Sequence, residues 1–387
     1  MYQFHYLSHY LKRQLNELYV STVILDFGSF ALAIFIPIYF FKLGFSIRQI
    51  VLWYAVHYIF YALICPLTAK IVSKIGYEKS IAISIPLYAI FLFSVVMIGH
   101  LPWLFYFAAF FWAFDKSFYW LAYHADFARY SQAGAKGEEV GYLRVLIGLT
   151  GVVAPAIGGF ILAKFGFAPL FALTILFAFA SLIPLLVTRE LKIEEDYDFK
   201  RFFKVLASKD YRSDVIANMG HGADVIAQAV WPIFIFSVVA DYRDVGILTT
   251  AVLFVTFALT LIAGKLSNKP QKTRMIKATS TGVAFSWFLK IFIYDWSTIF
   301  VIDSIYKVFR DTLEVPMQTL FYERPNGNRI LEYVVFREVV LSIGKIIVAL
   351  ACFTLLFFTD NLIYTFLLAG LFTLFHFFWK ERLPAVS

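Results

Sequence analysis

Long apolar stretches alternate with short polar segments along almost the whole chain. An α-helix needs about 20 predominantly apolar residues to cross a bilayer. By that measure the sequence predicts about twelve transmembrane helices. Their approximate bounds are 16–41, 46–68, 80–98, 102–124, 140–163, 167–187, 213–238, 244–264, 278–294, 297–321, 330–357 and 362–379. We therefore expect an all-α membrane protein.

One polar segment is much longer and more charged than the others. Residues 188–212 carry many acidic and basic side chains and separate the predicted helices into two sets of six. We interpret residues 1–187 as an N-terminal six-helix bundle and residues 213–387 as a C-terminal one. The segment between them is predicted to be a cytoplasmic linker loop.

The two sets of helices share landmarks at a single offset. Moving the sequence by 195 residues places residues 36–41 on 231–236, and residues 69–74 on 264–269. The first match aligns a proline within an apolar stretch, and the second aligns a charged connection. Two landmarks at one offset favour two parallel six-helix pseudo-repeats, which place a binding site between the halves near the middle of the membrane.

Composition and charge support a membrane location. Hydrophobic residues make up 61% and charged residues 16% of the chain, against roughly 45–50% and about 25% in soluble domains. The net charge of +8 comes from basic residues clustered in short connections, with few in the outer ones: Lys42, Arg48, Lys164 and Arg243. That is the positive-inside pattern, not a nucleic-acid surface. We expect a multi-pass monomer in the plasma (inner) membrane, both termini cytoplasmic, whose partners are the lipid bilayer and a small-molecule substrate, with no nucleic acid.

The connection after the second predicted helix resembles a family signature. In residues 69–79, Lys74 and Gly76 match a motif of the major facilitator superfamily, whereas Ser73 stands where the family has Asp and Tyr77 where it has Arg. The arrangement of six helices, charged loop and six helices resembles this family over the whole length. The resemblance implies a transporter that works by alternating access. The missing Asp implies a weaker or differently built charge lock at the cytoplasmic face.

A run of small residues and a proline marks the fifth predicted helix. It is similar to the glycine-proline motif of the proton-coupled exporter branch, except that Ala154 replaces a glycine. Small residues let two helices approach closely, and proline permits a bend, so close packing alone also explains the run. The candidates for gating or structural roles are Pro37, Lys74, Gly76, Gly151, Pro155, Gly158, Gly159 and Pro232.

Ionisable residues inside the predicted helices are the candidates for a site, because lipid makes them costly. In helix 297–321, a rotation of about 100° per residue places Asp303, Lys307, Arg310 and Glu314 on one face. A buried structural ladder of salt bridges is the alternative. Lys290, near the outer end of its helix, is interpreted as snorkelling to the interface. The substrate-cavity candidates are Asp115, Lys116, Tyr119, Tyr123, Gln228, Asp303, Lys307, Arg310, Glu338 and Lys345.

A titratable pair marks helix 213–238. His221 and Asp224 share a face, and histidine changes charge near neutral pH. The 195-residue offset places His221 on Asp26, so one titratable group from each half could face the other. Two isolated, satisfied polar groups are the alternative, and no further His or Cys is in view to complete a metal site. The proton-coupling candidates are Asp26, His221, Asp224 and Glu314.

Signatures of soluble catalysis and of ATP use, such as a Walker A or an HExxH motif, do not occur in the sequence. We therefore expect that the protein is not an enzyme and needs no cofactor. A proton gradient is the expected energy source. The leading hypothesis is a secondary active transporter that moves a small organic solute, by proton-coupled export. The alternatives are a flippase for a lipid or amphiphile on the same fold, and a non-transporting membrane sensor or enzyme.

Overall fold

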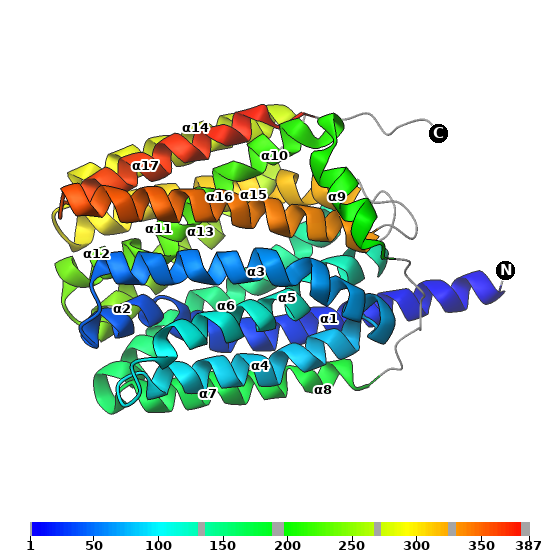
Figure 1. The fold of residues 1–387 in the computed structure, drawn as a ribbon, viewed down its shortest axis with the longest axis horizontal. Coiled ribbons are helices and arrows are strands. Elements are labelled where there is room, and N and C mark those ends of the chain that lie inside the picture. The colour runs from blue at the N-terminus through cyan, green and yellow to red at the C-terminus, as the bar shows by residue number, and fades with distance from the viewer. Residues whose placement is uncertain (1, 131–135, 188–196, 267–271, 324–329, 381–387) are drawn as a thin grey trace.

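The computed structural model describes residues 2–130, 136–187, 197–266, 272–323 and 330–380. Within these ranges every regular element is a helix, and the long helices run side by side along the longest axis of the molecule (Figure 1). Eight described stretches are long and apolar enough to cross a membrane. The all-α prediction is thereby confirmed for the described part of the chain.

The N-terminal half forms a succession of long helices. They are α1 (Tyr2–Ala33), α2 (Phe35–Lys42), α3 (Ile47–Ile75), α4 (Tyr77–Met97), α5 (Leu104–Tyr130), α6 (Lys136–Phe165), α7 (Phe167–Ala180) and α8 (Leu182–Leu185). A turn at Ile34 separates α1 from α2. Pro37 explains it, because proline has no N–H to donate to the carbonyl of Ala33 one helical turn earlier.

The predicted connection at residues 69–79 is almost entirely helical, which corrects the sequence interpretation. The helix α3 runs to Ile75 and α4 begins at Tyr77, so Gly76 alone links them. Its φ of 98° lies in the left-handed region that favours glycine. The apolar stretch ends several residues before the helix does, so Lys74 belongs to the last turn of α3 and not to a loop.

The C-terminal half contains more interruptions. Its elements are α9 (Phe199–Ala207), η1 (Lys209–Tyr211), α10 (Arg212–Asn218), η2 (Met219–Gly222), α11 (Ala223–Ala229), α12 (Trp231–Val239), α13 (Tyr242–Leu266), α14 (Lys272–Leu289), η3 (Lys290–Phe292), α15 (Trp296–Glu323), α16 (Ile330–Phe358), α17 (Ile363–Thr373) and η5 (Leu374–Phe378). The helix predicted at 213–238 is therefore broken twice, by the 3₁₀ turn η2 and by Val230. Two glycines in η2 and Pro232 after Val230 account for the breaks.

Part of the predicted linker loop is also helical. The Asp198 carboxylate caps α9 by accepting the Lys200 N–H at 2.9 Å, and this hydrogen bond lowers the pKa of Asp198. Phe202 is buried, and the Arg201 guanidinium lies 3.5 Å from the Glu332 carboxylate of α16. Residues 188–196 of the linker lie outside the described residues. The segment after them is thus an ordered helix held against the bundle.

Two helix pairs join the halves most extensively, α6 with α13 and α3 with α16. The first pair comes very close, because an added Cβ at Gly159 would lie 2.5 Å from the Tyr242 carbonyl oxygen, and one at Gly246 2.5 Å from that of Pro155. An added Cβ at Gly158 would likewise clash with the backbone of Ala31 on α1. Gly158 and Gly159 of α6 therefore serve close packing, as one of the two interpretations of the run expected.

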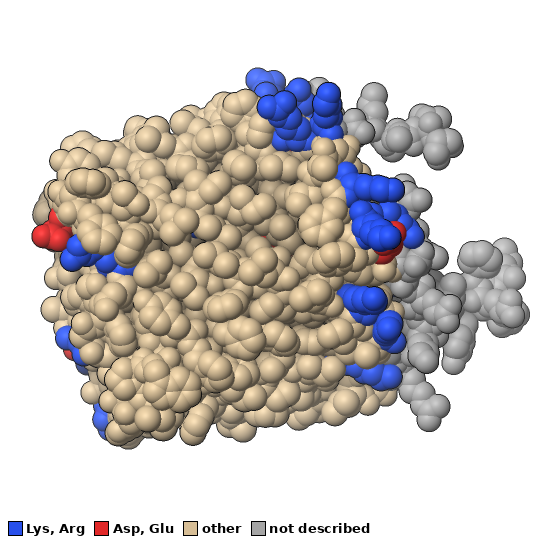
Figure 2. Space-filling view, viewed as in Figure 1, with Lys and Arg blue, Asp and Glu red and all other residues tan. Residues whose placement is uncertain are grey.

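Charge is distributed unevenly over the surface. Lys and Arg side chains gather at the end of the molecule that carries α9, whereas the long flank between the ends shows almost none (Figure 2). An uncharged flank bounded by charged ends is the surface that a bilayer-spanning protein presents to hydrocarbon and headgroups.

Candidate functional site

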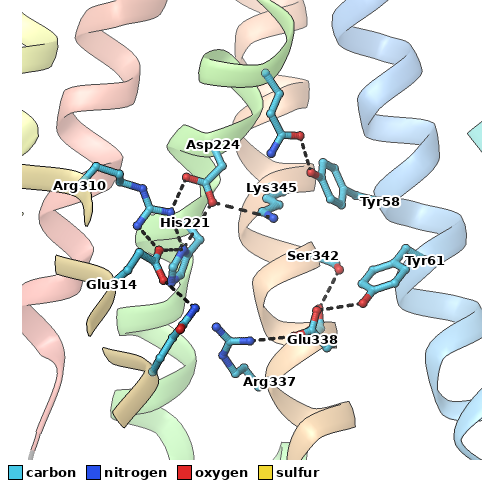
Figure 3. A network of polar contacts seen from close by, with 12 residues as sticks. Tyr58, Tyr61, His221, Asp224, Arg310, Glu314, Arg337, Glu338, Ser342 and Lys345 are labelled. Carbon is cyan, nitrogen blue, oxygen red and sulfur yellow. Dashed lines mark hydrogen bonds and ion pairs between the residues drawn. The ribbon is translucent and has the colours of Figure 1, made fainter. Parts of the chain in front are cut away.

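A network of charged side chains, partly exposed at Asp224, Arg310 and Lys345, lies where the interrupted helix α10–α12 meets α15 and α16 (Figure 3). The Arg310 guanidinium donates to Asp224 Oδ1 at 2.9 Å and also pairs with Glu314. The other Asp224 oxygen lies 3.4 Å from His221 Nδ1 and 3.9 Å from Lys345 Nζ. The structure thus brings together five residues that the sequence singled out on three separate helices.

Two glycines at the break let α16 and η5 pack closely against it. An added Cβ at Gly222 would lie 2.6 Å from the carbonyl oxygen of Gly344, and one at Gly220 would lie 2.7 Å from the ring of His376. His376 meets the His221 ring edge-on at a centroid distance of 4.8 Å. Sequence reasoning missed His376, because a lone histidine in an apolar stretch shows nothing of its neighbours.

The N-terminal half reaches this network through tyrosines of α3. The hydroxyl of Tyr58 donates to Gln228 Oε1 at 2.9 Å, and that of Tyr54 donates to the Gln228 carbonyl oxygen at 3.3 Å. That carbonyl is available because Pro232, four residues on, has no N–H to offer it. Lys345 Nζ lies 4.8 Å from the centre of the Tyr58 ring. The break in α11–α12 therefore creates a contact between the halves.

A second group of polar contacts joins the halves around Glu338 of α16. Its carboxylate accepts from Tyr61 of α3 at 2.9 Å and from Arg337 at 2.8 Å, and lies 3.7 Å from His124 Nε2 of α5. His124 Nδ1 is 2.7 Å from the hydroxyl of Tyr322 on α15. Four helices from both halves are thereby tied together. Nothing in the spacing of Tyr61 and Tyr322 could have revealed this.

A third polar group lies within the N-terminal half. Lys116 Nζ is 3.7 Å from Asp115 and faces the rings of Tyr88, Tyr119 and Trp120 at 5.4, 5.6 and 5.9 Å. The ammonium group thus sits among aromatic faces, which attract cations.

Asp26 belongs to this third group. It is close enough to Tyr88 and Tyr119 to act on both electrostatically. His221, which was expected to face it, is enclosed instead by Asp224, Arg310, Glu314 and His376. Tyr123 is buried and stacks on Tyr119 at 5.7 Å.

Lys290 does not snorkel, contrary to the sequence interpretation. Its side chain is completely buried, and Nζ donates to Asp303 Oδ1 at 2.8 Å. The nearby Lys307 acts electrostatically on Lys290. The polar face expected on α15 is therefore shared between two sites, Asp303 at one and Arg310 with Glu314 at the other.

A small cavity opens beside the charged network. It is lined by polar residues including Asp224, Arg310 and His376 and by the aromatic rings of Trp287 and Tyr306. A few convergent polar groups beside aromatic walls are typical of small-molecule sites.

Comparison with known proteins identifies the class of this fold and site. The family model of the Major Facilitator Superfamily matches residues 18–306, and the chain belongs to this family. It is accordingly an integral, multi-pass membrane transporter and not an enzyme.

Solved structures of the same fold cover nearly the whole chain. The E. coli fucose:proton symporter is 14% identical with a TM-score of 0.66, over 95% of this chain and 96% of that one. A D-xylose-proton symporter is 13% identical with a TM-score of 0.69, over 96% and 98%. At such identities the likeness concerns the fold alone.

A curated relative is the uncharacterized protein YqgE of Bacillus subtilis (strain 168). It is 23% identical over 250 residues, which are 62% of this chain and 58% of the relative's length. The match therefore leaves much of both chains unaligned.

Proposed function

We propose that the chain is a proton-coupled secondary transporter that exports a small organic solute by alternating access. Its helices form about twelve spans in two six-helix pseudo-repeats, residues 1–187 and 213–387. The monomer lies in the plasma (inner) membrane with the linker and both termini in the cytoplasm. The gathering of basic residues at the end that carries α9 supports this orientation (Figure 2). The proton gradient supplies the energy, and no cofactor is needed.

The single observation that carries the proposal is that several basic residues share the Asp224 carboxylate. One carboxylate lies within ion-pair distance of three basic groups, Arg310, His221 and Lys345. Buried charges are stable only while they are paired. A proton or a substrate charge that enters the network must therefore redistribute these pairs. Because Asp224 follows the break in the helix, such a redistribution can move the segments on either side.

The contacts between the halves provide the parts of a gate. Tyr58 and Gln228 bridge α3 and α11, and Tyr61, His124 and Glu338 bridge α3, α5 and α16. These contacts must break for the halves to separate at that level. The closely packed pair α6–α13 then serves as a surface on which one half rocks against the other.

The flippase alternative is favoured less by these observations. A flippase for an amphiphile needs a lateral opening between the halves, whereas α6–α13 and α3–α16 are both packed together in this conformation. The cavity is also lined in part by charged residues, which suit a polar or charged solute.

The proposal is tested in proteoliposomes. A thermal-shift screen of organic cations, anions and zwitterions first selects a stabilising solute, and its flux is then measured with and without a pH gradient. We expect the gradient to drive flux by the wild type and by Asp360→Asn, an exposed acid. Asp224→Asn should abolish gradient-driven flux. Flux that ignores the gradient, or an Asp224→Asn variant as active as Asp360→Asn, would refute proton coupling through this network.

A further inference from the structure

A lysine ammonium group occupies an aromatic cage in the C-terminal half. Lys290 Nζ lies 3.2 Å from the ring centre of Trp231, 4.5 Å from that of Trp287 and 4.4 Å from that of Tyr306. Asp303 accepts its hydrogen bond at 2.8 Å. Three rings and a carboxylate around one cation form the kind of site by which proteins recognise ammonium ligands. Here the cation belongs to the protein itself.

The cage is assembled from the elements around the broken helix. Trp231 begins α12 directly after the second break, Trp287 comes from the end of α14, and Tyr306 comes from α15. Phe366 of α17 packs against both indoles, at 5.6 and 5.9 Å. The indole N–H groups of the two tryptophans are buried and have no hydrogen-bond partner among the described residues. The two tryptophans thus present the faces of their rings to the ammonium group, while their indole N–H groups make no hydrogen bond to a described residue.

The charged residues around the cage can stabilise only one cation. The charged groups within the described residues that act on Lys290 are Asp303 and Lys307, both on α15. Asp303 pairs with Lys290, and Lys307 repels it. A second ammonium group could not enter while Lys290 stays protonated, because it would be a buried charge without a partner.

The cage is connected to the cavity of the charged network. Trp287 and Tyr306 line that cavity together with Asp224 and Arg310. The cavity and the cage therefore share two aromatic walls.

We propose that the cage is an organic-cation subsite in which the ammonium group of the substrate replaces that of Lys290. When the substrate cation pairs with Asp303, the Lys290 ammonium loses its proton to water, and the neutral amine withdraws. One N–H bond breaks, one proton leaves for each cation bound, and the cage keeps a single positive charge. The inference rests on the proposed function, and it names the substrate class and the exchange of one cation for one proton.

Binding of tetramethylammonium to the purified full-length protein tests this. The probe carries no ionisable proton, and its binding can be followed by tryptophan fluorescence at matched ionic strength. If one proton is released per cation, the affinity of the wild type rises about tenfold per pH unit from neutral to alkaline pH. Lys290→Met should bind more tightly, whereas Lys277→Met, an exposed lysine of α14, should behave as the wild type. Asp303→Asn should not bind.

Two results would overturn the inference: wild-type affinity that does not change with pH, or no binding by either the wild type or a folded Lys290→Met. If Lys290→Met does not fold, the Lys290→Met/Asp303→Asn double variant removes the whole ion pair and serves as the folded, non-binding control. The wild-type pH series then decides.

The outcome is separable from that of the proposed function. Gradient-driven flux of a solute by a protein that binds no tetramethylammonium would refute only the cage. Proton-linked tetramethylammonium binding without any gradient-driven flux would refute only the transport proposal.

Discussion

Gly158→Ala should destabilise the protein, whereas Gly141→Ala on the same helix should not. An ideal Cβ at Gly158 would lie 2.0 Å from the carbonyl oxygen and 2.9 Å from the carbonyl carbon of Ala31 on α1, whereas nothing lies within 4 Å of one at Gly141. An ordinary contact needs about 3.4 Å, so the Ala31 carbonyl would have to retreat by about 1.4 Å. Both of its atoms are backbone, so no side-chain rotation relieves the clash.

The magnitude follows from two opposing terms. Overpacking costs about 1–3 kcal/mol, and an unyielding backbone contact belongs at the upper end, about 3 kcal/mol. Replacing glycine by alanine within a helix contributes about 1 kcal/mol of stability. We expect the unfolding free energy to fall by about 2 kcal/mol for Gly158→Ala and to rise by about 1 kcal/mol for Gly141→Ala.

The assay is denaturation of the purified variants in detergent, followed by tryptophan fluorescence and by loss of the monodisperse peak in size-exclusion chromatography. Both substitutions add the same methyl group to the same helix, so differences in detergent binding should cancel. Equal stabilities, or a Gly158→Ala variant more stable than Gly141→Ala, would show that α1 and α6 are not packed as described.

Two further substitutions test the packing of charges and the backbone by the same denaturation assay. Glu338→Ala leaves Arg337 buried without its carboxylate and should lower the unfolding free energy by about 3–5 kcal/mol. The matched Glu323→Ala, which removes a half-exposed partner of Lys272, should change it by less than about 1 kcal/mol; similar losses for both would contradict the burial of the Glu338 contacts. Gly76→Ala forces a side chain into a φ of 98° with a ψ of 169°, a region open essentially to glycine alone, and should cost about 1–3 kcal/mol; an unchanged stability would argue against the one-residue link.

The sequence predicted the helices well because the length of an apolar stretch is what a bilayer constrains. The described helices follow the predicted stretches closely, and their family was identifiable from residues such as Lys74 and Gly76. Breaks were harder to predict. The turn η2 at Met219–Gly222 depends on glycines whose backbone is approached by α16 and η5. This approach is a tertiary contact, which the local sequence does not reveal.

The members of the central network could be chosen from the sequence, but not all of their partners could. Charges within apolar stretches are conspicuous, so Asp224 and Arg310 were found. Tyr58 and His376 were not found, because a tyrosine or a histidine in an apolar stretch can serve many different roles. Lys290 was misinterpreted because the depth of a residue in its helix says nothing of whether a neighbouring helix buries it.

Distances between spin labels as a function of pH test whether proton binding in the Asp224 network drives alternating access, and they need no substrate. One pair, Leu43→Cys with Ser237→Cys, reports on the ends of α2 and α12. Another, Lys74→Cys with Arg274→Cys, reports on the end of α3 and the start of α14. Both are built with Cys65 and Cys352 replaced by alanine, which removes the native thiols. If protonation of the network shifts the halves, a pH change lengthens one distance while it shortens the other, and both distances become independent of pH in Asp224→Asn. Distances that stay constant with pH, or that respond equally in Asp224→Asn, would contradict it.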